Sequence, residues 1–228
     1  MRKNYKIVQE IQTHNQVIQD FDKIKLEASW HFKAIYTVEA DNTPPNSVPM
    51  NLVPMMVERK DNIELMQRIT IEELKTVMEE MEEDKAPGPG GFNASFIKVC
   101  SEIVHKDLLN MVLKAQQCDK IRGSTNSTFL DLIPKEKYAV SFDIFRPISL
   151  CNIGYKIITK IMANRLKYIM PWIIPKNQGG FIKGTIIWDN IILVQEAIHS
   201  ILKNWDKGMV VKIYLANAFD RVYHSFLF

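Results

Sequence analysis

The chain has 228 residues, of which 46% are hydrophobic and 24% charged, a composition typical of a globular protein and not of a disordered one. No apolar run approaches the roughly 18 residues of a membrane-spanning helix, so the sequence predicts no integral membrane protein, and its polar start indicates no secretory signal. The net charge is only +3, yet residues 1–84 carry 10 basic and 16 acidic side chains, whereas residues 85–228 carry 19 and 10.

The basic excess is concentrated in residues 120–185, which hold 11 basic and 3 acidic side chains. A local positive charge attracts polyanions, and nucleic acid is the commonest of them. A solvated basic face without a partner is the alternative that charge alone leaves open.

The first part of the chain is predicted to be a helical and linker extension, residues 1–60. The segment 1–35 is polar and helix-prone, with only loosely periodic apolar residues. Two prolines in Asp41–Ser47 forbid a helix there, and Pro49 and Pro54 continue the irregular stretch. We therefore expect a boundary in this region.

Two helices are predicted on either side of a Pro-Gly loop. Thr70 followed three residues later by Glu73 indicates a capping box, and apolar residues then recur at helical spacing as far as Met81. Lys85–Gly91 alternates proline and glycine and predicts a tight loop, because neither residue continues a helix. The second helix is predicted over Ala94–Gln117.

A hairpin is predicted next. Phe129–Lys135 and Asp143–Leu150 are strand-like runs, and Glu136–Phe142 is the candidate loop between them.

The last elements are two helices and a strand. A helix is predicted over Tyr155–Met170 and is expected to stop at Pro171, and Asp189 is expected to cap a helix over Asn190–Lys203. Gly208–Leu215 predicts a buried strand.

Six separated segments, in this order and spacing, resemble the reverse transcriptase of non-long-terminal-repeat (LINE-type) retrotransposons, especially the plant type. The resemblance runs from about residue 60 to the end of the sequence. The segments are Lys85–Phe92 (KAPGPGGF), Asn126–Lys135 (NSTFLDLIPK), Phe145–Asn152 (FRPISLCN), Tyr155–Leu166 (YKIITKIMANRL), Gln178–Asn190 (QGGFIKGTIIWDN) and Lys212–Val222 (KIYLANAFDRV).

The resemblance implies an α+β right-hand polymerase fold, mostly helical with short antiparallel strands. Residues 61–205 correspond to the fingers and residues 206–228 to the start of the palm, which we expect to be truncated. It also implies an RNA template, a DNA primer and deoxynucleoside triphosphates as partners, and Mg²⁺ as cofactor.

The metal site departs from the family pattern. A metal-binding Asp of the family stands two residues after a strand lysine, which corresponds to Lys212, and this chain has Tyr214 there. A phenol is neutral at pH 7 and offers no anionic oxygen to Mg²⁺, which prefers carboxylates. Asp220 lies too far along the chain to replace the missing group and is interpreted as structural. No catalytic or metal-binding residue is therefore expected to be intact, and Mg²⁺ is not expected to bind well.

Other family roles carry over by position. Lys135 and Arg146 resemble the fingers residues that grip the incoming triphosphate, and cationic side chains suit phosphate oxygens. Surface charges on a β-ribbon are the alternative. Phe219 resembles the aromatic residue that rejects a 2′-hydroxyl, Ala218 resembles a backbone donor to phosphate, and Gln178 belongs to a motif associated with template and nucleotide.

Contacts with the template–primer backbone are expected from further basic residues, although a solvated charge is the alternative for each. These residues are Lys156, Lys160, Arg165, Lys167 and Lys183. Two more family positions are changed, because Gly90 replaces an Asp and Thr185 replaces an Arg.

The leading hypothesis is a degenerate reverse transcriptase segment that cannot polymerise. A non-catalytic RNA-binding module and a pseudogene product without function are the alternatives. A hydrolase or a nucleotide-binding kinase or Rossmann domain is disfavoured, because the histidines lack metal-like spacing and neither glycine fingerprint is present. Three cysteines, 18 and 33 residues apart, fit neither a disulfide framework nor a zinc site and favour a reducing compartment, nuclear or cytoplasmic.

Overall fold

The structure is a computed structural model. It describes residues 8, 10–13, 17–37, 54–118, 120–175, 178–180, 182, 184–204, 208–211 and 213. The chain groups into two compact units, one made of residues 1–53, 131–148 and 211–228 and the other of residues 54–130 and 149–210. Residues 131–148 thus group with the N-terminal segment, although the sequence assigned them to the fingers. The expected mixture of helices and short antiparallel strands is confirmed, while the right-hand arrangement stays a prediction.

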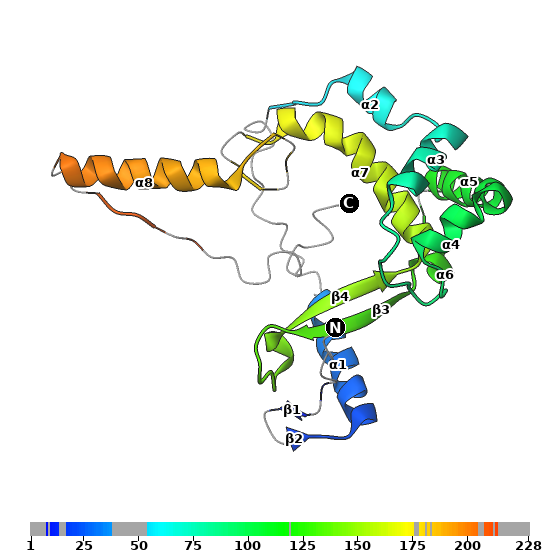
Figure 1. The fold of residues 1–228 in the computed structure, drawn as a ribbon, viewed down its shortest axis with the longest axis horizontal. Coiled ribbons are helices and arrows are strands. Elements are labelled where there is room, and N and C mark those ends of the chain that lie inside the picture. The colour runs from blue at the N-terminus through cyan, green and yellow to red at the C-terminus, as the bar shows by residue number, and fades with distance from the viewer. Residues whose placement is uncertain are drawn as a thin grey trace. The chain divides into compact units, whose positions relative to one another are not determined.

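The larger unit is helical, as the coloured ribbon in Figure 1 shows. Its helices are α2 (Arg59–Leu65), α3 (Ile71–Glu80), α4 (Ala94–Val99), α5 (Ser101–Cys118), α6 (Gly123–Asn126), α7 (Ile153–Ile173) and α8 (Ile187–Lys203).

The core of this unit forms where α3 packs on α5 and α7. Leu74 and Val77 on α3 and Ile157 and Ile161 on α7 are almost completely buried. Each pair is spaced by one helical turn, so each helix presents one apolar stripe to its neighbour. The amphipathic pattern that predicted these helices therefore also decided which faces meet.

The start of α3 differs in part from the expected capping box. The Thr70 hydroxyl accepts a hydrogen bond from the Glu73 main-chain N–H at 3.2 Å, as predicted. The Glu73 carboxylate, however, bonds to Arg165 of α7. A reciprocal capping box is found instead at α2, between Glu58 and Asp61.

The predicted helix over Ala94–Gln117 is interrupted at Cys100, which separates α4 from α5. The N–H of Cys100 bonds to the carbonyl of Phe96, and its own carbonyl accepts from the N–H groups of Ile103 and Val104. The residue thus ends one helix and begins the next.

The predicted stop at Pro171 is wrong, because α7 continues through this proline to Ile173. A proline lacks one N–H donor, but the Ile174 N–H still reaches the Met170 carbonyl at 2.9 Å. The predicted start of α8 is also late. The helix begins at Ile187, so Asp189 lies inside the first turn, where its charge complements the helix N-terminus.

The predicted hairpin is present, formed by β3 (Thr128–Pro134) and β4 (Phe145–Cys151). Its loop contains a short 3₁₀ helix, Phe142–Ile144, and is closed by the Lys135 N–H, which bonds to the Ile144 carbonyl at 2.8 Å.

The smaller unit combines the tip of this hairpin with β1 (Ile11–Gln12), β2 (Val17–Ile18) and α1 (Phe21–Tyr36). The strands β1 and β2 pair antiparallel, so among the described residues of the helix-prone segment 1–35 the helix begins only at Phe21. Its core consists of Ile11, Ile18, Ile24, Phe32, Phe142 and Phe145.

The predicted buried strand over Gly208–Leu215 is not found among its described residues. Residues 208–211 and 213 adopt no strand, and Val210, Val211 and Ile213 are exposed. A row of apolar residues forms a strand only where another strand pairs with it, and the described strands pair elsewhere. In the part of the chain that the structure describes, no helix is long and apolar enough to cross a bilayer.

Candidate functional site

The smaller unit contains a pocket of about 350 Å³ between α1 and the tip of the β3–β4 hairpin. Lys135 and Arg146, the two residues expected to hold a triphosphate, both line it. His31 and Asp143 add one imidazole and one carboxylate. The rest of the lining is apolar and consists of Phe32, Ile35, Phe142, Phe145, Pro147 and Ile148.

The two cations of this pocket differ in how firmly they are held. The Lys135 ammonium donates to the main-chain carbonyl of Asp143 at 2.9 Å, which fixes it at the closed end of the hairpin. Arg146 is exposed on β4 and makes no hydrogen bond or ion pair with any residue that the structure describes. A guanidinium without a protein partner keeps its full fork of donors for phosphate oxygens.

His31 was not predicted as part of any site. It lies on α1, with Nε2 3.9 Å from Oδ1 of Asp143 and its ring centroid 5.3 Å from that of Phe142. No local signal could have identified it, because α1 precedes the six resembling segments and joins the pocket only through tertiary packing.

The lysines of α7 are partly occupied by contacts within the larger unit. The Lys156 ammonium donates to the Ala86 carbonyl at 2.8 Å, and the Lys160 ammonium lies 3.2 Å from the Glu80 carboxylate. Lys167 forms no direct ion pair among the described residues. Of the three, Lys167 therefore has its ammonium most available for nucleic acid.

Glu80 is held in its charged form by these neighbours. A hydrogen bond from Asn164 first, and one from Lys160 second, keep the pKa of the Glu80 carboxyl below its ordinary value. The charges of Lys160 and Lys167 lower this pKa further.

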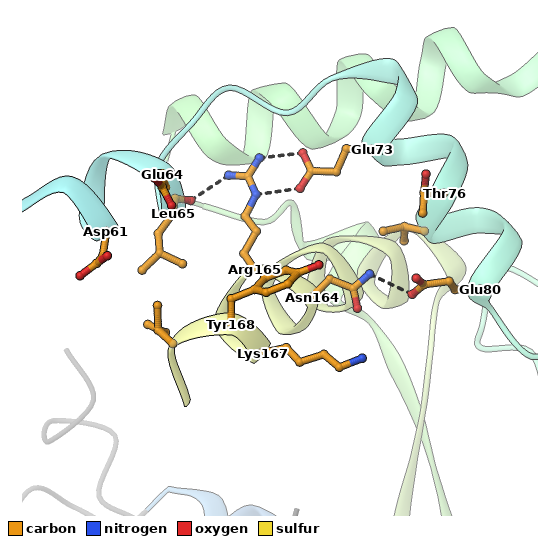
Figure 2. A pocket seen from close by; sticks show the side chains of 12 residues that line it. Asp61, Glu64, Leu65, Glu73, Thr76, Glu80, Asn164, Arg165, Lys167 and Tyr168 are labelled. Atoms are coloured by element: carbon orange, nitrogen blue, oxygen red, sulfur yellow. Dashed lines mark hydrogen bonds and ion pairs between the residues drawn. The ribbon is translucent and has the colours of Figure 1, made fainter. Parts of the chain in front are cut away.

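Arg165 is held by hydrogen bonds within the larger unit, and Figure 2 shows those to Glu73 and Leu65. Its guanidinium forms two hydrogen bonds to the Glu73 carboxylate, at 2.8 and 2.7 Å. It also donates to the main-chain carbonyls of Leu65 and Gln67, at 2.8 and 2.7 Å. Only 16% of the Arg165 side chain is exposed. The arrangement joins α2, α3 and α7, and it leaves this guanidinium few donors for a nucleic-acid phosphate.

The Pro-Gly loop is held against the start of α7 by Asn152. The side-chain oxygen of Asn152 accepts from the Gly90 N–H at 2.7 Å, and its amide donates to Ser124 and Ser127 at 2.9 and 3.0 Å. A Cβ on Gly88 would lie 2.4 Å from the main-chain carbon of Cys151. The resembling segments Lys85–Phe92 and Phe145–Asn152 thus meet in space, and the missing Cβ of Gly88 in the first segment allows the close approach.

The other predicted site residues are placed only in part. The N–H of Gln178 bonds to the Pro175 carbonyl at 3.0 Å, after the end of α7. The remaining four lie outside the described residues, and they are Lys183, Tyr214, Ala218 and Phe219. Among the residues that the structure describes, no group of three or more His, Cys, Asp or Glu is placed to hold a metal ion.

Two comparisons with known proteins bear on this site. Residues 133–228 match the family model described as reverse transcriptase (RNA-dependent DNA polymerase). A curated relative, the Transposon TX1 uncharacterized 149 kDa protein of Xenopus laevis, is 27% identical over 176 residues. The aligned part covers 77% of this chain but only 13% of that protein. Residues 133–228 therefore carry a reverse transcriptase domain match, in a chain that is homologous to a transposon protein.

Proposed function

We propose that this chain is a reverse transcriptase segment, derived from an RNA-directed DNA polymerase of a plant-type, LINE-type retrotransposon, that does not polymerise but binds a deoxynucleoside triphosphate and contacts an RNA template and a DNA primer. The proposal assigns residues 61–205 to the fingers, residues 206–228 to the palm and residues 1–60 to an N-terminal extension. Its main support is that Lys135 and Arg146 line one pocket, at the start of the segment that matches the reverse transcriptase family.

The pocket has the chemistry that a triphosphate needs. Its two exposed cations lie next to apolar side chains. Phosphate oxygens can therefore contact the cations while the sugar or base packs on the apolar side chains. Asp143 is the one acid among the lining residues that the structure describes, and their net charge is positive while His31 is neutral. Phe219, Ala218 and Gln178 are proposed to complete the nucleotide site.

The proposed lack of catalysis rests on the position of the metal ligand. Reverse transcriptases use divalent metal ions, and Tyr214 stands where a carboxylate ligand is expected. A neutral phenol does not provide the anionic oxygen that a hard cation requires. Tyr214 at this position therefore does not suit Mg²⁺, and this chain is proposed not to polymerise.

Primer extension and triphosphate binding test the two halves of this proposal separately. With oligo(dT) on poly(rA), labelled dTTP and either Mg²⁺ or Mn²⁺, we expect no template-dependent incorporation. Equilibrium dialysis with labelled dTTP should still detect binding, and Lys135→Ala with Arg146→Ala should weaken it about tenfold or more. Template-dependent incorporation by the purified protein would refute the proposed inactivity. A dTTP affinity of the double variant equal to that of the wild type would refute the role of the pocket in triphosphate binding.

A non-catalytic RNA-binding module is the second candidate, favoured by the basic excess in residues 120–185 and the available ammonium of Lys167. It predicts RNA affinity that falls steeply between 50 and 200 mM salt. Lys167→Ala should lower the slope of log affinity against log salt by about one unit, whereas Lys75→Ala, which removes a lysine paired with Glu102, should not. A salt-independent affinity would count against this candidate.

A product without function is the remaining alternative. It is favoured by α8, a largely apolar helix with no buried residue. This alternative predicts a broad, non-cooperative thermal transition, and a sharp calorimetric peak would refute it.

A further inference from the structure

The proposed nucleotide pocket is not built from the reverse transcriptase match alone. One wall comes from α1, through His31, Phe32 and Ile35, and this helix precedes the matched residues 133–228. We propose that His31 is a third phosphate-contacting residue of this pocket, which joins Lys135 and Arg146 and strengthens triphosphate binding when its imidazole is protonated. This inference rests on the proposed function and adds a residue that neither the family match nor the sequence pattern identifies.

Aromatic contacts hold the imidazole at the wall of the pocket. The ring of His31 packs edge-on to Phe32, with centroids 5.0 Å apart at 87°, and is tilted 33° against Phe142. Phe32 and Phe142 are both buried in the core of this unit. The imidazole of His31 therefore packs on two buried aromatic rings, and 28% of the His31 side chain remains exposed. An imidazole that is anchored on one side and open on the other can reach a ligand without a large loss of side-chain freedom.

The charges around His31 favour an anion once the ring is protonated. Asp143 faces it from the hairpin tip at 3.9 Å, and Lys135 and Arg146 line the same pocket from β3 and β4. Glu27 lies one turn earlier on α1. The described lining residues together carry a net charge of +1 with a neutral imidazole and +2 with a protonated one. Histidine is the side chain whose charge ordinarily changes between pH 5 and 8, so this difference is accessible to experiment.

Asp143 competes with phosphate for the imidazole. Its side chain is 76% exposed, and 3.9 Å is a long separation for an ion pair, so the carboxylate is weakly held and can give way to a ligand. The ammonium of Lys135 bonds to the main chain of Asp143 and not to its carboxylate. Replacing this carboxylate by an amide therefore leaves the lysine contact intact and removes the competing anion, while an amide oxygen can still accept the 3.5 Å hydrogen bond from the Ser141 hydroxyl.

Equilibrium dialysis of the full chain with labelled dTTP, at pH 6 and pH 8, tests the proposal. We expect His31→Gln to bind about fivefold more weakly than the wild type at pH 6 and equally well at pH 8. The charge of the triphosphate itself also changes between pH 6 and pH 8. The difference in dTTP affinity of His31→Gln between these two pH values measures that effect directly, because this variant has no imidazole at position 31. Circular dichroism on the same samples establishes that the variant has kept its helices.

Two further variants separate failure of this inference from failure of the proposed function. Asp143→Asn should tighten dTTP binding at pH 6 more in the wild-type background than in His31→Gln, because His31 then meets no competing anion, and an equal gain in both backgrounds would count against a phosphate contact. If Lys135→Ala with Arg146→Ala abolishes binding while His31→Gln matches the wild type at both pH values, the pocket stands and the role of His31 is refuted. If the wild type and the double variant bind dTTP equally, both proposals are overturned.

Discussion

Replacing Arg165 should destabilise the larger unit more than any change to its surface charges. Arg165→Met would remove two hydrogen bonds to Glu73 and two to main-chain carbonyls, while keeping much of the aliphatic volume. Breaking a buried charged pair from one side costs about 3–5 kcal/mol, because the other charge is left unpaired. The side chains of Arg165 and Glu73 are 16% and 27% exposed, so water recovers part of this cost. We expect a loss of about 2–4 kcal/mol in the free energy of unfolding.

Urea unfolding followed by circular dichroism measures this loss, and two variants sharpen the interpretation. Arg165→Lys keeps the charge but lacks the planar fork, so it should lose about 1–2 kcal/mol. Lys75→Met breaks an exposed pair with Glu102 and should lose no more than about 0.5 kcal/mol.

The outcome also bears on the expected role of Arg165 in nucleic-acid binding. A stability of Arg165→Met within about 0.5 kcal/mol of the wild type would show that the contacts in Figure 2 do not hold the helices together. With that result, Arg165 would again be a candidate for contacting nucleic acid. A large loss, with RNA affinity retained by Arg165→Lys, would make Arg165 a structural residue.

Two further expectations concern the Pro-Gly loop and acid stability. Gly88→Ala should destabilise the chain by about 1–3 kcal/mol, because the new Cβ would meet the main chain of Cys151, whereas Gly123→Ala, with nothing within 4 Å, should have little effect on the thermal midpoint. Because the hydrogen bond from Asn164 lowers the pKa of Glu80 in the folded state, its contribution is present above the ordinary value of 4.5 and is lost as the pH falls through the folded pKa. Glu80→Gln should therefore lose less stability on acidification than the wild type, and parallel pH profiles of the two proteins would contradict this linkage.

Local sequence pattern was sufficient for most of the elements and for the family resemblance. Thr70 and the apolar spacing after it predicted α3, and the two strand-like runs predicted the β3–β4 hairpin. These signals work because hydrogen bonds within a helix or across a short hairpin join residues that are close in the sequence. Errors arose at element boundaries and at the strand predicted over Gly208–Leu215, which its described residues do not form. Pro171 sits inside α7, because the hydrogen bonds of neighbouring residues continue past it, and Asp189 sits inside the first turn of α8, where its charge complements the helix N-terminus as it would at the cap.

Tertiary structure alone decided which charges meet. Arg165 and Glu73 are 92 residues apart and pair because α3 packs on α7, which no spacing rule anticipates. The Asn152 contact with Gly90 spans 62 residues, and it joins two segments that the sequence related only by order. The position of His31 beside Lys135 and Arg146 depends in the same way on the packing of α1 against the hairpin tip. The amino-acid pattern sets the apolar face of each element, but the charges that share a site are known only once those faces have been brought together.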